Sequence, residues 1–201
     1  MKIDNKEKLR VLYDFPKGRS EVKVLPTLEK HSIHFINTSP FLTLATIDTE
    51  GKMDCSPRGG TPGFVKVIDN NTIIIPDSKG NNRLGSIVNI IETNKVGCLF
   101  IIPGVDETLR INGSVSISTD ENYLRMYPNE KNPPKCIIEI KVNEVYLHCA
   151  KAFMRSKLWA EESKIDRKSF PTMGQMINDQ TGDHSEIETQ EAMIERYKEN
   201  L

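Results

Sequence analysis

Alternation of apolar and polar positions is clearest between residues 109 and 118. The odd positions from Leu109 to Ile117 are apolar apart from Gly113, and the even positions from Arg110 to Ser118 are polar. Successive side chains of a strand point to opposite faces, so this pattern predicts a strand. One face of it is expected on a core and the other on solvent or a ligand.

A second long strand is predicted from Cys136 to Cys149. Its apolar positions are even up to Val142 and odd from Val145, and the change of phase falls at Asn143-Glu144. Such a change indicates a β-bulge or a sharp bend, and bends of this kind let a sheet close into a barrel. Further strands are expected over 41–47 and 96–102, and a hairpin over 64–68 and 72–75.

Helical spacing occurs at several places between the strands. Apolar residues at 84, 87, 88 and 91 predict an amphipathic helix over 82–93. Other helices are expected over 27–37 with Thr27 as a candidate cap, over 120–126 behind Thr119 or Asp120, over 150–161, and from residue 186 onward. Because the strands mostly follow one another without long helical crossovers, the pattern favours an antiparallel sheet or small β-barrel with helices around it.

The 201 residues suit one domain with small appendages. Residues 1–26 are highly charged and contain the Pro16-Lys17-Gly18 turn, so they are interpreted as an N-terminal arm. The main domain is expected over 27–182 and a C-terminal helix over 183–201.

Charge and cysteine usage narrow the class of protein. Lys plus Arg number 27 and Asp plus Glu number 28, a balance that argues against a general electrostatic grip on nucleic acid or an anionic membrane. No apolar stretch follows the charged N-terminus, and no apolar run approaches the length of a membrane span. The four cysteines form no CxxC pair, which is typical of buried, reduced thiols in a cytoplasmic protein.

The most informative candidate for chemistry is the segment Asp77-Ser78-Lys79-Gly80-Asn81-Asn82-Arg83, which joins a predicted strand to a predicted helix. A helix N-terminus offers unpaired N–H groups, glycine permits close approach of a ligand, and Arg83 adds a forked cation. Together these features suit a phosphate. The plainer interpretation is an ordinary capped helix beside a surface arginine.

Two other arginines are candidates for the same anion. Arg58 precedes Gly59 and Gly60 in what reads as a glycine-rich loop, and Arg110 lies on the polar face of the strand over 109–118. Three arginines near loop and strand ends could converge on one dianion. Arg58 could equally belong to a plain loop, and Arg110 could be solvated or salt-bridged.

A basic stripe and two histidines complete the candidates. Lys151 and Arg155 are four residues apart and Trp159 is four further, so a helix would place them on one face, able to bind an anion and stack on a ring. The alternative is a basic surface helix. His31 and His34 have helical spacing, but they lack further ligands nearby, and no metal site is predicted.

Several of these segments together resemble the pyridoxamine 5′-phosphate oxidase-like flavoproteins. The motifs are Ser-Pro-Arg-Gly at 56–59, Pro-Gly-Phe-Val at 62–65, the segment at 76–83, Val-Gly-x-Leu-Phe at 96–100 and Thr-Leu-Arg-x-Asn-Gly at 108–113. The stretches at 144–159 and 171–182 are similar to the same bacterial branch, so the resemblance covers about residues 27 to 182.

The resemblance implies an antiparallel split β-barrel that binds FMN, usually as a homodimer with flavin sites at the subunit interface. It places Asn82 and Arg83 at the FMN phosphate, with Asp77 just before them. Arg58 and Arg110 match motif positions for phosphate or ribityl contacts, and Thr108 matches a polar position that reaches the flavin. Lys151, Arg155 and Trp159 are expected to approach from the C-terminal region, across the dimer.

Departures from the family pattern bear on the substrate. Authentic pyridoxamine-phosphate oxidases carry an arginine-lysine pair where this chain has Asn82-Arg83, and their C-terminal substrate pattern of tryptophan-glycine and arginine is absent. The expectation is therefore an FMN-dependent oxidoreductase of a small molecule not yet defined, with no catalytic residue singled out. Two alternatives remain: a non-catalytic binder of flavin or of haem, with His31, His34 or His148 as axial ligand, and a dimerisation domain with an empty site.

Overall fold

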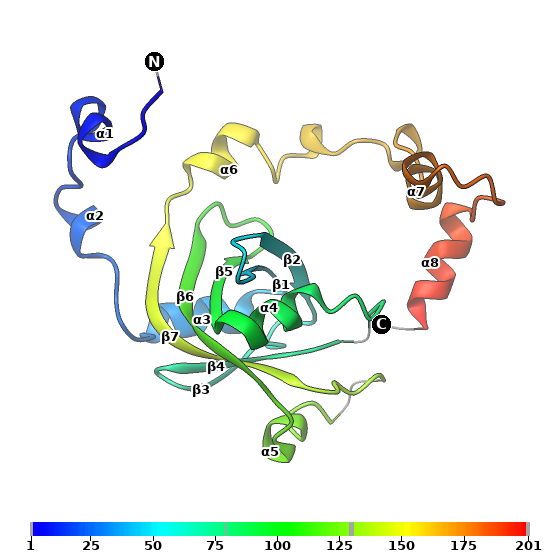
Figure 1. The fold of residues 1–201 in the computed structure, drawn as a ribbon, viewed down its shortest axis with the longest axis horizontal. Coiled ribbons are helices and arrows are strands. Elements are labelled where there is room, and N and C mark those ends of the chain that lie inside the picture. The colour runs from blue at the N-terminus through cyan, green and yellow to red at the C-terminus, as the bar shows by residue number, and fades with distance from the viewer. Residues whose placement is uncertain (1, 79, 129–130, 200–201) are drawn as a thin grey trace.

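Seven strands form one antiparallel sheet in the order β2-β1-β5-β6-β7-β4-β3 in the computed structural model, which describes residues 2–78, 80–128 and 131–199 (Figure 1). The strands are β1 (Phe41–Ile47), β2 (Met53–Gly59), β3 (Lys66–Asp69), β4 (Thr72–Pro76), β5 (Lys95–Ile101), β6 (Thr108–Ser118) and β7 (Ile137–His148). The outermost strands, β2 and β3, are not paired with each other, so the sheet bends over a core without closing. The predicted antiparallel split barrel is confirmed.

The bend lies where the change of phase predicted it. The register of β6 against β7 shifts between Asn112 and Gly113, and Asn143 is the extra residue on β7. A Cβ on Gly113 would lie 2.2 Å from the carbonyl oxygen of Lys141, so only glycine fits opposite the bulge. On one side of this point β6 pairs with β5, and on the other β7 pairs with β4. The two halves of the sheet therefore face one another across the core.

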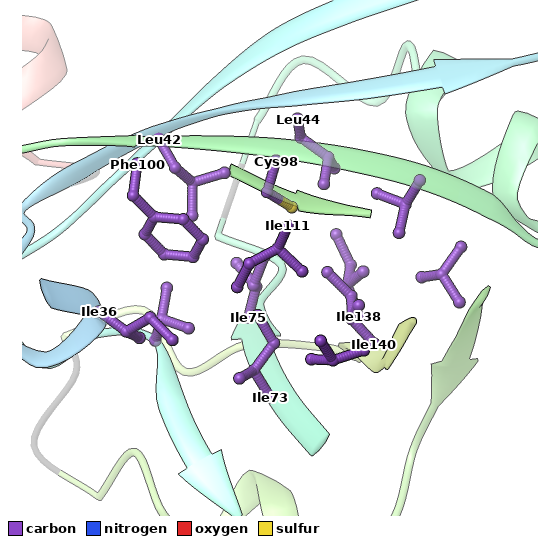
Figure 2. Close-up of a cluster of buried hydrophobic side chains, with 14 of the residues drawn as sticks. Ile36, Leu42, Leu44, Ile73, Ile75, Cys98, Phe100, Ile111, Ile138 and Ile140 are labelled. Carbon is purple, nitrogen blue, oxygen red and sulfur yellow. The ribbon is translucent and has the colours of Figure 1, made fainter. Parts of the chain in front are cut away.

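Apolar side chains from both halves fill the space between them, and Figure 2 shows the central part of this core. Phe100 and Ile111 come from the half that holds β1 and β5, and Ile73 and Ile140 come from the other half; all four are fully buried. Helix α3 (Lys30–Thr38) covers one opening with Ile36, and helix α4 (Gly85–Thr93) covers another with Ile90. A smaller cluster of Ile74, Tyr127 and Ile137 adds to this main core.

Element boundaries differ from the sequence prediction where side chains compete for the backbone. Helix α3 begins at Lys30, because the Glu29 carboxylate accepts hydrogen bonds from the N–H groups of His31 and Ser32 and the Ser32 hydroxyl accepts one from the N–H of Glu29. The expected cap at Thr27 is wrong. Helix α5 (Glu121–Leu124) is capped by Asp120, one of the two predicted caps.

The stretch expected as a glycine-rich loop around Arg58 is in fact strand β2, which pairs with β1 over seven positions. It gave no strand signal because both of its faces are partly open, so its side chains need not alternate between apolar and polar. Pro57 is tolerated because an edge strand leaves one row of backbone groups unpaired.

The chain ends carry no buried side chain in the part that the structure describes. Burial begins at Leu28, and the last buried residue is Val145. The N-terminal arm contains α1 (Lys6–Leu12) and α2 (Arg19–Val22) and meets the sheet through a bridge between Leu25 and Val145. The C-terminal part contains α6 (Lys151–Ser156), two short 3₁₀ turns at Glu161–Ser163 and Arg167–Ser169, α7 (Met173–Thr181), which the sequence did not suggest, and α8 (Gln190–Lys198).

Helix length and cysteine burial bear on two further expectations. Among the described residues, no helix has the length and apolar character to cross a membrane. All four cysteines are free thiols, but only Cys98 is buried, whereas Cys55 and Cys149 are exposed. The expectation that the thiols are buried is therefore confirmed for Cys98 alone.

Candidate functional site

The predicted phosphate segment lies beside strand β2 and forms one wall of a cavity of about 690 Å³. We call it the Arg58 cavity. Its other walls are the inward side of β2, the first turn of α4 and the segment at 132–136. The residues that the argument uses are Asp54, Ser56, Arg58, Asp77, Arg83, Ser86 and Lys135. Strand β2 turns its even-numbered side chains toward this cavity.

The backbone before α4 adopts a conformation that opens the helix N-terminus. Asn82 and Leu84 have positive φ angles of 61° and 55°, and α4 starts only at Gly85. The predicted start at residue 82 is therefore wrong, and Asn82 and Arg83 belong to the preceding loop. No side chain caps α4. Its first N–H groups, which have no partner within the helix, lie at the wall of the cavity.

Arg58 is held at the base of the cavity by an ion pair. Its Nη1 donates to Asp77 Oδ1 at 3.2 Å, and each side chain is only 19% exposed. The Nε of Arg58 is buried and has no hydrogen-bond partner among the described residues. Because burying an N–H without a partner costs free energy, this atom is a candidate donor to a ligand that the cavity receives.

The second carboxylate of the cavity is also satisfied. Ser86 donates its hydroxyl to Asp54 Oδ2 at 2.6 Å, and the hydroxyl oxygens of Ser56 and Ser86 lie 2.9 Å apart. Both acids therefore have partners within the chain. The cations Arg83 and Lys135 have no side-chain hydrogen bond or ion pair with any described residue. The cavity therefore carries positive charge that its own acids do not neutralise.

The pKa of the Cys136 thiol depends on burial and on the same ion pair. Burial raises its pKa, the nearby Asp77 carboxylate raises it further, and Arg58 acts in the opposite direction. The raised pKa favours the protonated thiol, which is a poor nucleophile.

A second cavity of about 550 Å³ lies on the outward face of the same half of the sheet. We call it the Arg110 cavity. It is lined by outward side chains of β1, β5 and β6, by Met53 of β2, and by Phe153 of α6. Thr108, Arg110 and His148 lie there, and the Arg110 guanidinium stands 5.3 Å from the centre of the Tyr146 ring.

The structure brings together only part of the predicted site. Arg58, Asp77, Asn82 and Arg83 share the Arg58 cavity, whereas Thr108 and Arg110 line the other one. Within one chain, the three arginines do not converge.

The expected stripe of Lys151, Arg155 and Trp159 does not form either. Helix α6 ends at Ser156, because Lys157 takes a left-handed conformation, and Trp159 instead donates its indole N–H to the carbonyl oxygen of Val105 at 3.1 Å.

Two residues of the Arg58 cavity were missed from the sequence, namely Asp54 and Lys135. Each sits in a stretch with no recognisable motif, and only the pairing of β2 and the path of the chain into β7 bring them beside Arg83. His31 and His34 line neither cavity. Across the described residues, no group of three or more His, Cys, Asp or Glu side chains could hold a metal ion.

Comparison with known proteins identifies the family. The family model described as pyridoxamine 5′-phosphate oxidase matches residues 28–149, which is more than half of the chain. The chain belongs to this family. The matched region coincides with the buried core and includes Arg58, Asp77, Arg83 and Arg110. None of the curated proteins compared with the chain matches it significantly.

Solved structures are similar to this chain in fold. A crystal structure of HupZ from Group A Streptococcus has 19% identity and a TM-score of 0.50, covering 59% of this chain and 91% of its own. A second HupZ structure, of a point variant, has 18% identity and the same TM-score, covering 60% and 98%. An FMN-binding protein from Syntrophomonas wolfei subsp. wolfei has 17% identity and a TM-score of 0.48, covering 72% and 93%.

Proposed function

We propose that this protein binds FMN, with the flavin phosphate in the Arg58 cavity, and acts as an FMN-dependent oxidoreductase on a small molecule. The observation that carries the proposal is the buried Nε of Arg58, which lacks a partner in a cavity that also receives an uncapped helix N-terminus and two unpaired cations. A phosphate dianion satisfies all of these groups at once.

The charge balance favours a dianion over a neutral ligand. Arg58 neutralises Asp77, and Asp54, whose only side-chain partner among the described residues is the neutral Ser86 hydroxyl, offsets one of the two cations Arg83 and Lys135. The described lining therefore keeps a net positive charge beside the N-terminus of α4. Asp77 acts as a positioning residue, because its ion pair orients the Arg58 guanidinium. The membership of the pyridoxamine 5′-phosphate oxidase family supports the same ligand.

The size of the cavity supports a ligand larger than phosphate. The linked hydroxyl groups of Ser56 and Ser86 are suited to the hydroxyls of a ribityl chain, and Asn82 lies on the same wall. FMN, when bound, would supply the hydride or electron transfer, and the protein would orient it and shield it from water.

Thr108 and Arg110, in the other cavity, are proposed to reach the flavin of a second chain in a homodimer. Lys151, Arg155 and Trp159 would approach the flavin from the same side, since Ala152 and Phe153 of α6 line the Arg110 cavity.

Titration of the purified protein with FMN tests the proposal, using quenching of flavin fluorescence as the readout. The variants Arg83→Ala and Arg58→Lys are compared with Arg125→Ala, which removes an exposed arginine paired with Glu121 on α5. We expect the dissociation constant to rise roughly 10- to 150-fold in the first two, because a charge-assisted hydrogen bond contributes about 1.5–3 kcal/mol. The control variant is expected to bind like the unchanged protein.

Two results would overturn the proposal. If the unchanged protein does not bind FMN, the proposed ligand is wrong. If all three variants bind FMN equally well, the proposed location of its phosphate in the Arg58 cavity is wrong. A Soret band on addition of haemin that is lost in His148→Ala would instead favour haem in the Arg110 cavity, since His148 alone of the three candidate histidines lines a cavity.

A further inference from the structure

The C-terminal arm, residues 151–198, forms helices that pack against little of the rest of the described chain. It contains α6, α7 and α8, none of which has a buried residue, and it runs along the top and right of Figure 1, away from the barrel. Its exposed apolar side chains are Met154, Leu158, Ile165, Phe170, Met173, Ile177, Ile187, Ile194 and Tyr197. A helix with an apolar face in water normally has that face packed on another surface.

Among the described residues, side-chain hydrogen bonds join the arm to its own barrel only near its two ends. At the start, Trp159 donates to Val105, and at the far end Lys131 and Asn132 donate to the carbonyl oxygens of Lys198 and Glu199 at 3.3 and 3.4 Å. Between these points, α7 and α8 are nine residues long each. Helices of this length are marginal in water unless a tertiary contact supports them.

The accessible surface of the chain measures this deficit. It is 14,071 Å² for a mass of 22.8 kDa. A compact monomer of that mass exposes about 9,600 Å², so the excess is about 4,500 Å². A standard interface removes about 800 Å² from each partner, and obligate dimers remove more. The exposed N-terminal arm and the C-terminal arm both contribute to this excess, so uncovered surface is available for an interface between two chains.

A matching surface exists on the barrel. Leu84, Val88 and Ile91 follow one another at helical spacing along the outer side of α4, and they are 50%, 47% and 67% exposed. Ile87 and Ile90, which adjoin this stripe around the helix, are buried in the core. The apolar face of α4 is thus wider than the part that the core covers, which is expected of a helix with a second packing partner.

We infer that the C-terminal arm of each chain packs across α4 of a second copy of this chain. A second copy is favoured over an unrelated partner because both unpartnered surfaces are on the same polypeptide. A two-fold axis would cover the arm and the α4 stripe in both chains at once. The inference rests on the homodimer of the proposed function but not on the presence of flavin.

The arrangement has a consequence for the site. The stripe on α4 begins at Leu84, which also lines the Arg58 cavity. An arm packed on Leu84 therefore contacts the lining of that cavity.

Sedimentation velocity of the full chain, without added flavin, tests the inference with Ile91→Glu on α4 and Ile177→Glu on α7. Their matched controls, Glu92→Gln and Gln180→Glu, alter exposed polar positions of the same helices. We expect a dimer for the unchanged chain and both controls. Each glutamate variant is expected to raise the dimer dissociation constant about 100-fold or more, because a two-fold interface repeats every change. Circular dichroism should show an intact fold in all of them.

A cross-linking experiment separates contact between chains from contact within one chain. Unlabelled and ¹⁵N-labelled chains are refolded together and treated with a lysine-reactive cross-linker, and links between Lys168 of the arm and Lys95, the first residue of β5 after α4, are identified by mass spectrometry. Links between a light and a heavy chain are expected. Links confined to one chain, or a dimer unaffected by both glutamate variants, would overturn the arm contact alone. A monomeric unchanged chain would overturn the homodimer as well, whereas FMN binding is measured independently of both.

Discussion

Replacing Gly113 with alanine tests the bend that shapes the barrel. The added Cβ would lie 2.2 Å from the carbonyl oxygen of Lys141 and 3.1 Å from Cγ2 of Ile140, which is fully buried. An ordinary contact with that oxygen is more than 1 Å longer, so the two strands must separate at their tightest point. Because the opposing atom belongs to the backbone, no side-chain rotation can relieve the clash.

The expected cost follows from this geometry. Overpacking in a well-packed region costs about 1–3 kcal/mol, and a backbone clash belongs at the upper end. Alanine recovers about 0.4–1 kcal/mol by restricting the unfolded chain. The free energy of unfolding should therefore fall by about 2–3 kcal/mol, which corresponds to a loss of roughly 4–12 °C in Tm for a chain of this size.

Gly97→Ala is the matched control, since it makes the same change in the neighbouring strand β5. Its Cβ would meet Oδ1 of Asn112 at 3.2 Å, the end of a side chain that can move aside. We expect its stability within about 1 kcal/mol of the unchanged protein. Urea unfolding should be followed by far-UV circular dichroism and not by tryptophan fluorescence, because the single tryptophan, Trp159, lies in the C-terminal arm. All variants should be compared at one protein concentration. Equal stability of the two variants, within about 0.5 kcal/mol, would refute the argument that the bulge requires glycine.

Three further predictions concern single side chains. Partial burial would raise the pKa of Glu29, but hydrogen bonds from His31 and Ser32 outweigh it and the pKa is lowered. Glu29→Ala should therefore lower the free energy of unfolding by about 1 kcal/mol at neutral pH. Unfolding titrations at several pH values should show this full loss above the ordinary pKa of 4.5. The difference between the two proteins should vanish as the pH falls through the lowered folded-state pKa of Glu29. Burial raises the pKa of Cys98 to about 12, so mass spectrometry after iodoacetamide treatment at pH 8 should find this thiol unmodified in the folded protein, and modification at the rate of the unfolded chain would contradict its burial. Ser86→Ala leaves the Asp54 carboxylate without its donor, and urea unfolding should show a loss of about 1–2 kcal/mol; an unchanged midpoint would mean that the hydroxyl contributes nothing.

Local patterns in the sequence were sufficient for most of the fold. The alternation in β6 and the change of phase in β7 predicted two long strands and the bulge between them, because side-chain direction in a strand depends only on position along the chain. The amphipathic spacing in α4 predicted that helix for the same reason. The family resemblance predicted Arg58, Asp77 and Arg83 as one site, and the structure places all three around one cavity.

The tertiary structure decided what depends on distant segments. Strand β2 has no alternation of its own and is a strand because β1 pairs with it. Arg58 and Arg110 lie only 52 positions apart in sequence yet open onto different cavities, since β2 presents its even positions to one side and β6 presents Arg110 to the other. The ends of helices α4 and α6 were set by left-handed residues at Leu84 and Lys157, which no hydrophobic pattern records. Local propensity acts over a few residues, whereas the lining of a charged cavity comes from segments that are distant in the sequence. The residues that line the cavity are therefore known only from the folded sheet.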